Sequence, residues 1–119
     1  EGDSTTSTAP TPATTTQTFS GTIDQLGSAV HSFTVSATGT VTIGLTSVGP
    51  LATMALGVGM GAWDGVNCGT SIAQNENARA GSAALTGTAT AGNYCVRVYD
   101  SGNIPEGWSV SYTVQVAHP

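Results

Sequence analysis

The chain has 119 residues, of which only 8% are charged, and it contains no lysine. Two arginines stand against seven carboxylates, which gives a formal net charge of −5 at pH 7. Binding to nucleic acid or to an anionic lipid surface needs clustered Lys and Arg, so the composition excludes both. The sequence also has no run of about 18 apolar residues, which excludes insertion into a membrane as a helix.

Residues 1–18 are predicted to be a Thr/Pro-rich, extended N-terminal arm. Eight of the fifteen residues from Ser4 to Thr18 are threonine, two are proline, and none is a large apolar residue. A segment of this composition cannot bury enough apolar surface to fold alone. Three interpretations remain open: a flexible linker, a mucin-like stalk, and a strand that is donated to another molecule.

The positions of the prolines favour strand donation. Pro10 and Pro12 have the same parity, so their missing N–H groups lie on one side of an extended segment. The odd-numbered residues keep their donors on the other side, and the segment can therefore add to one exposed sheet edge. The predicted assembly arm consists of Thr5, Ser7, Ala9, Pro10, Thr11, Pro12, Ala13 and Thr15.

The same arm has the composition of an O-glycosylated stalk, in which Ser and Thr accompany Pro. No Asn-x-Ser/Thr sequence occurs in the chain, so any glycan is expected to be O-linked. The candidate O-glycosylation sites are Thr5, Thr6, Thr8, Thr11, Thr14, Thr15, Thr16 and Thr18.

From residue 19 onward, apolar and polar residues alternate with a period of two, which is typical of half-buried strands. Turn residues separate these runs, and no helical stripe of useful length occurs. The pattern predicts an all-β fold for residues 19–119, an antiparallel, jelly-roll-like β-sandwich of about seven or eight strands. Residues 69–82 fit no strand and are expected to form a long loop. The alternating runs are residues 19–23, 31–35, 41–45, 54–60, 94–98 and 110–116.

Cys68 and Cys95 are predicted to form a structural disulfide. A metal site or a redox motif needs closely spaced cysteines or additional ligands, whereas 26 residues separate this pair. Disulfides persist outside the reducing cytosol, and the composition is rich in Thr, Gly and Ser. We therefore expect a secreted protein at the cell surface. The N-terminus shows no basic region followed by an apolar stretch, so any secretion signal is expected to have been removed.

No catalytic, metal or cofactor site is predicted. His31 lies in an expected strand and His118 is the penultimate residue, where poor order is expected. No Gly-x-Ser-x-Gly elbow surrounds a serine. Asp64 and Asp100 lie in turns, where capping of the loop is the expected role. Each turn offers two or three oxygen ligands, too few for calcium.

Residues 84–103, ALTGTATAGNYCVRVYDSGN, and residues 108–116, WSVSYTVQV, together resemble the bacterial pre-peptidase C-terminal (PPC) domain. The resemblance lies in an aliphatic strand, an Ala-Gly-x-Tyr turn, a valine-rich strand and a final Tyr-x-Val-x-Val. Residues 19–23 and 31–47 agree with the first half of that family. The resemblance implies a β-sandwich on a secreted bacterial protein, without catalytic residues of its own. The acidic residues that relatives carry before the second strand are absent here, since those positions hold Ala29, Val30 and His31.

These features predict a secreted bacterial structural protein that is not an enzyme. We expect it to be a subunit of an extracellular filament or surface assembly, joined to copies of itself head to tail by N-terminal strand donation. The alternative is a non-catalytic carbohydrate- or protein-binding module of a secreted hydrolase. In that case Trp63 and Trp108 could form a platform for sugar stacking, although each is more often a rim residue of a sandwich.

Overall fold

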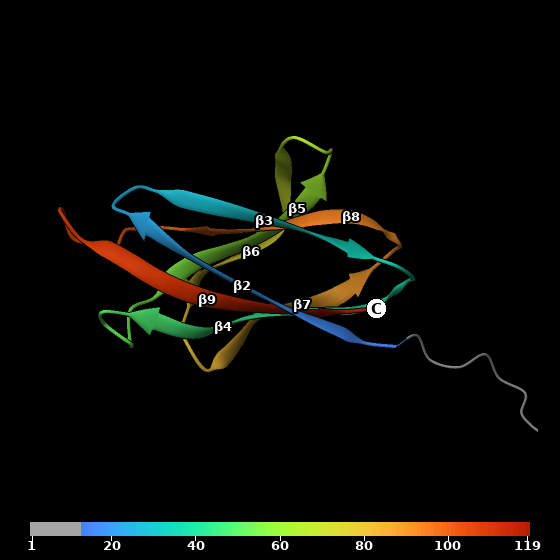
Figure 1. Ribbon diagram of the computed structural model, residues 1–119, viewed down its shortest axis with the longest axis horizontal. Helices are drawn as coiled ribbons and strands as arrows, with labels where there is room; N and C mark the ends of the chain where they lie inside the picture. Colours follow the sequence, from blue (N-terminus) through green and yellow to red (C-terminus); the bar gives the residue numbers. More distant parts are fainter. Residues whose placement is uncertain (1–12) are drawn as a thin grey trace, which may run out of the picture.

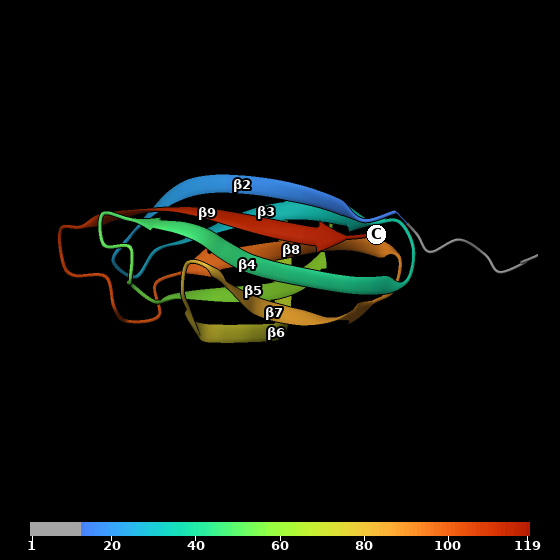
Figure 2. The same cartoon turned by 90° about the horizontal axis from the view of Figure 1, so that it is seen from below.

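The structure, a computed structural model, describes residues 13–119, which form eight antiparallel strands in two four-stranded sheets (Figure 1). This confirms the predicted all-β sandwich. No helix able to span a membrane is present among these residues. The first sheet, seen face-on in Figure 2, contains in this order β2 (Thr15–Asp24), β9 (Ser109–His118), β4 (Gly39–Gly49) and β7 (Ser82–Ala89). The second sheet contains β3 (Ser28–Val35), β8 (Gly92–Tyr99), β5 (Leu56–Trp63) and β6 (Cys68–Ala78), also in this order.

The core lies between the two sheets and consists of the apolar residues of the alternating runs. In β9, for example, Val110, Tyr112, Val114 and Val116 are buried, while the intervening side chains lie on the outer face. Because successive side chains of a strand point to opposite faces, each alternating run supplies one inner row. Burial of apolar side chains contributes about 1.5–3 kcal/mol for each large residue, so these rows are the main source of stability.

The first strand begins four residues before the boundary predicted between the arm and the domain. Residues 15–18, expected to be the last part of the arm, instead pair with β9 of the same chain, with Thr15 opposite His118 and Thr18 opposite Gln115. Thr15 is therefore a residue of the sandwich and not of a free arm. The sequence does not show the alternation of a half-buried strand at residues 15–18, because β2 lies at a sheet edge and its first residues are exposed and polar.

The loop predicted at residues 69–82 is wrong, since most of this segment belongs to the 11-residue strand β6. This strand lies at the edge of the second sheet, and its register against β5 shifts at three places. Bulges interrupt the period-two alternation of side chains, and few residues of β6 are buried. The usual sequence pattern of a strand is therefore missing.

The C-terminal end is well held, contrary to the expectation of poor order. His118 is only 4% exposed. Its ring forms hydrogen bonds with Oε1 of Gln17 at 2.7 Å and with the oxygen of Pro119 at 2.9 Å. The backbone N–H of Ser36 also donates to the oxygen of Pro119. The last two residues thus close the end of the sandwich at which β2 begins.

Candidate functional site

The two open sides of the sandwich differ, and the side between β2 and β3 is closed by aromatic rings. Phe19 of β2 stacks on His31 of β3 with ring centroids 4.9 Å apart. Nε2 of His31 lies 2.7 Å from the hydroxyl of Tyr112, which is buried. Burial lowers the pKa of His31 and raises the pKa of Tyr112. The bond joins β3 of the second sheet to β9 of the first.

The opposite side, between β6 and β7, holds an apolar groove of about 360 Å³. Buried core residues line its inner part, and β6 and β7 supply its walls. Tyr94 lies among the lining residues and donates its hydroxyl hydrogen to the backbone oxygen of Thr90 at 2.8 Å. The lining contains no charged side chain; it consists of Val41, Ile43, Met60, Ile72, Ala73, Leu85, Thr86, Gly87, Thr88, Ala89, Thr90 and Tyr94.

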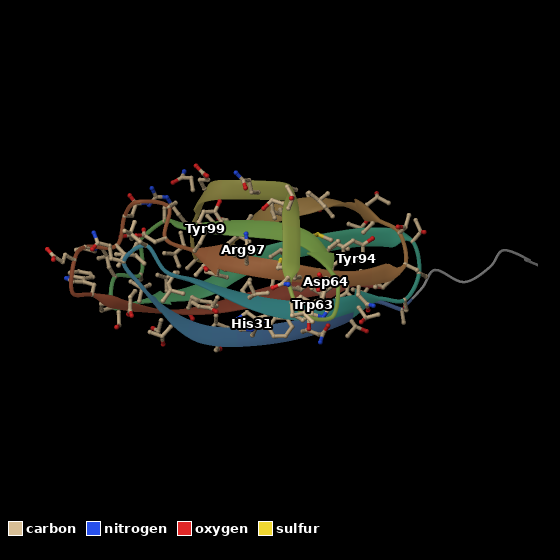
Figure 3. All side chains as sticks on the ribbon, turned by 90° about the horizontal axis from the view of Figure 1, so that it is seen from above. His31, Trp63, Asp64, Tyr94, Arg97 and Tyr99 are labelled. Atoms are coloured by element: carbon tan, nitrogen blue, oxygen red, sulfur yellow. A yellow bond between two sulfur atoms is a disulfide. The ribbon has the colours of Figure 1, made fainter. Side chains whose placement is uncertain are left out.

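The groove is open because the first part of β6 does not extend along this side of the sandwich and so does not cover it. Figure 3 shows this part of β6 crossing in front of the second sheet, and Figure 1 shows the β5–β6 hairpin rising away from that sheet. Glycines in β5 allow the backbone of β6 to lie close to β5, because a Cβ on Gly61 would lie only 2.7 Å from the backbone oxygen of Gly69. Ile72, which lies on this displaced strand, remains 64% exposed.

The predicted disulfide between Cys68 and Cys95 is present, with the two Cα atoms 5.7 Å apart. It joins the start of β6 to β8, so it fixes the crossing segment on the outer face of the second sheet. Arg97 supports the same contact, because its guanidinium donates to the backbone oxygen of Cys68 at 3.3 Å. The disulfide thereby maintains the displacement of β6 that opens the groove.

The free edge of β7 runs along this groove. β7 is the last strand of its sheet in the described part of the chain. Near the β6–β7 turn, the side-chain amide of Asn75 donates to the backbone oxygen of Ala84 at 3.0 Å and closes the gap. Beyond this point, Gly87 has no atom within 4 Å of the place a Cβ would occupy. The space beside Gly87, in the middle of β7, is therefore open.

The carboxylates of the turns have the capping role that the sequence indicates. Oδ1 of Asp64 accepts hydrogen bonds from the backbone N–H groups of Val66 and Asn67, and these bonds lower the pKa of Asp64. Desolvation acts to raise the pKa of Asp100, but four backbone N–H donors outweigh it and the pKa is lowered. Within residues 13–119, no group of three or more His, Cys, Asp or Glu side chains could hold a metal ion. The four donors to Asp100 belong to Leu26, Gly102, Asn103 and Ile104.

The two tryptophans do not form a common platform. Trp63 ends β5 beside Ala62, which is paired with Tyr94 near the start of β8. Trp108 precedes Ser109, which is paired with Asp24 at the other end of the sandwich. Trp108 is 40% exposed, and Trp63, labelled in Figure 3, is half-buried.

Most of the predicted arm lies outside the described residues, including Thr5, Thr6, Ser7, Thr8, Ala9, Pro10, Thr11 and Pro12. Ala13 and Thr14 precede β2 and are exposed. Among the candidate glycosylation sites, Thr14, Thr15, Thr16 and Thr18 are described, and all four are exposed.

Sequence reasoning missed the groove between β6 and β7. Two weak signals marked it: Ile72 is an isolated apolar residue in a polar stretch, and Gly87 interrupts a strand that is otherwise rich in Thr and Ala. The sequence matches no family model and no curated protein.

Proposed function

We propose that this protein is a secreted structural subunit of an extracellular filament or surface assembly, built on a PPC-like sandwich whose copies are joined by N-terminal strand donation. The observation that carries the proposal is the apolar groove along the free edge of β7. An unpaired strand beside exposed apolar surface is a template for an added strand, and natural proteins usually blunt or cover such an edge. Here the chain also supplies a segment with the properties of an added strand.

Secretion is supported by the disulfide between Cys68 and Cys95, because such bonds persist in oxidising compartments. Head-to-tail donation is a heterologous contact, which propagates into a filament unless its rotation closes a ring. The surface exposure of Thr14, Thr15, Thr16 and Thr18 is compatible with O-linked glycans on the same arm.

Deletion of residues 1–12 tests the proposal. This deletion leaves β2 intact, whereas a longer deletion to residue 18 would remove strand residues that pair with β9. The full-length chain is expected to polymerise, as seen by electron microscopy and sedimentation, and the truncated chain is expected to remain a folded monomer. Normal assembly of the truncated chain would contradict the proposal.

The alternative, a binding module of a secreted hydrolase, makes a different prediction. The native product would then carry a catalytic domain and would remain monomeric at every concentration. The length of the mature native protein and its sedimentation behaviour separate the two. Its intact mass also tests the glycans, because an O-glycosylated arm adds mass that maps to the threonines of residues 5–18.

A further inference from the structure

We propose that the groove between β6 and β7 is the acceptor site for assembly, and that its occupant is residues 5–13 of a second copy. The donated segment adds to the free edge of β7 as a fifth strand of the first sheet and covers the open side of the core. This inference rests on the proposed function and assigns the surface on which strand donation takes place.

The length of the arm matches the free edge. The edge of β7 beyond the contact between Asn75 and Ala84 comprises residues 85–89, which span about 17 Å at 3.3 Å per residue. Residues 5–13, when extended, span about 30 Å. The arm therefore reaches along the whole free edge and leaves residues over for the junction between the two copies.

The chemistry of the arm matches the groove. Neither the lining residues nor residues 4–18 include a charged side chain, so no charge is buried without a partner when the arm binds. The acceptor already supplies large side chains, namely Met60, Ile72, Leu85 and Tyr94. The space beside Gly87 remains to be filled, and the methyl groups of alanine and threonine are small enough for it. The lack of bulky anchors in the arm is therefore no obstacle.

An extended arm lacks two backbone donors on one side and keeps all of them on the other. Pro10 and Pro12 lack N–H groups on the side that carries the even-numbered residues. Ser7, Ala9 and Thr11 keep theirs on the other side, which can pair with β7. Since the outer side of the added strand lacks two donors, it is a poor template for yet another strand. Each groove thus takes one arm.

A second copy fits the groove better than the arm of the same chain. β2 begins at the edge opposite β7, three strands away in the first sheet, which is about 14 Å. Only Ala13 and Thr14 lie between Pro12 and the start of β2, and residues that precede proline favour extended conformations. The arm of the same chain would also run parallel to β7, since β2 begins at the end where β7 finishes. Parallel pairing is the less stable arrangement per residue.

The substitution Gly87→Val tests the site in the full-length chain. The valine side chain would occupy the empty part of the groove without a clash, and Gly87 does not have a positive φ. Valine also suits a strand. The matched control is Ala83→Val, an exposed position of the same strand outside the groove. Gly87→Val is expected to lose polymer at concentrations at which the wild type and Ala83→Val are fully assembled.

A cross-linking experiment identifies the occupant and does not depend on the folding of Gly87→Val. Chains with Thr8→Cys are mixed with chains with Thr88→Cys, because both side chains are expected on the outer face of the sheet when Ala9 and Ala13 face the groove. Oxidation is expected to link one chain of each kind. The control mixture uses Thr22→Cys, on the exposed face of β2, and is expected to give no link. A link that forms only within a doubly substituted chain would show that the arm of the same chain is the occupant and would overturn the proposal.

The two proposals fail in different ways. If the wild type forms no polymer, the proposed function fails, and the acceptor site fails with it. If the wild type assembles through its arm while Gly87→Val also assembles and no Thr8–Thr88 link forms, only the acceptor site is wrong. Capture of a foreign extended peptide in the groove of a wild type that remains monomeric would likewise overturn the second-copy assignment.

Discussion

His31 and Tyr112 join the two sheets by a side-chain hydrogen bond of 2.7 Å, 81 residues apart in sequence. The bond lies on the side of the sandwich that Phe19 closes by stacking on His31. On the other side, hydrogen bonds cross the groove between β6 and β7 at its two ends, from Asn75 to Ala84 and from Tyr94 to Thr90. Among the described residues, none crosses it along residues 85–89. The asymmetry explains why one side of the core is closed within the domain while the other remains open.

Stability is expected to depend on the protonation of His31. Burial holds the pKa of its imidazole below the ordinary value of 6.5 in the folded state. Below about pH 6.5 the unfolded chain therefore binds a proton at His31 that the folded chain does not bind, and the free energy of unfolding falls. Above that pH both states are neutral at this residue and its contribution is constant. Urea unfolding between pH 8 and pH 5 measures the dependence.

The matched variant for this pH dependence is His31→Gln, which keeps a polar partner for Tyr112 but cannot titrate. It is expected to lose less stability than the wild type over the same pH range. Equal losses in the two proteins would show that the proton is taken up elsewhere.

Reduction of the Cys68–Cys95 disulfide is expected to lower the free energy of unfolding by about 3–4 kcal/mol, from the entropy of closing a loop of this size. The sequence separation of the two residues is 27. Denaturant unfolding with and without reductant measures the change. Hydrogen exchange should locate the loosened region at the start of β6, because the bond fixes that segment to β8. Two free thiols in native protein, detected by mass after alkylation, would contradict the prediction.

Two glycines of the first sheet are expected to respond in opposite ways to alanine. A Cβ on Gly21 would lie 2.5 Å from the hydroxyl of Tyr112, so Gly21→Ala is expected to cost about 1–3 kcal/mol as an overpacked site. Gly87→Ala meets no atom within 4 Å and is expected to stabilise the monomer by up to about 1 kcal/mol, since alanine restricts the unfolded chain. Urea unfolding of the two variants provides the comparison. Similar destabilisation by both would mean that the space beside Gly87 is filled in the monomer.

The sequence was informative wherever one face of a strand is buried. The alternation in residues 110–116 predicted β9 and its buried row, and the spacing and chemistry of the two cysteines predicted their bond. The pattern failed at the sheet edges. The first residues of β2 are polar and exposed, and bulges against β5 interrupt the alternation of β6.

The burial of His118 and the opening of the groove were also beyond sequence reasoning, because both depend on contacts between distant segments. His118 is held by Gln17, 101 residues away in sequence. The groove exists because the first part of β6 crosses over the glycine-containing strand β5. No local sequence pattern indicates this displacement of β6.

The parity of the arm gives the sharpest test of strand donation. Thr11→Pro removes an N–H from the side that is expected to pair with β7, while Thr8→Pro removes one from the side that already lacks the donors of Pro10 and Pro12. Both variants add one proline to the same segment, so they change its stiffness to a similar extent.

Thr11→Pro is expected to weaken assembly by raising the critical concentration about fivefold to tenfold. A net backbone hydrogen bond contributes about 1 kcal/mol, and an acceptor left without a donor adds to the loss. Thr8→Pro is expected to change the critical concentration by no more than about twofold. The reason is that it removes no donor from the side expected to pair with β7, and such substitutions usually change the free energy by less than about 0.5 kcal/mol. Sedimentation of full-length chains over a range of concentrations gives the critical concentration of each variant. Equal effects of the two prolines would show that the arm does not pair through its odd-numbered residues.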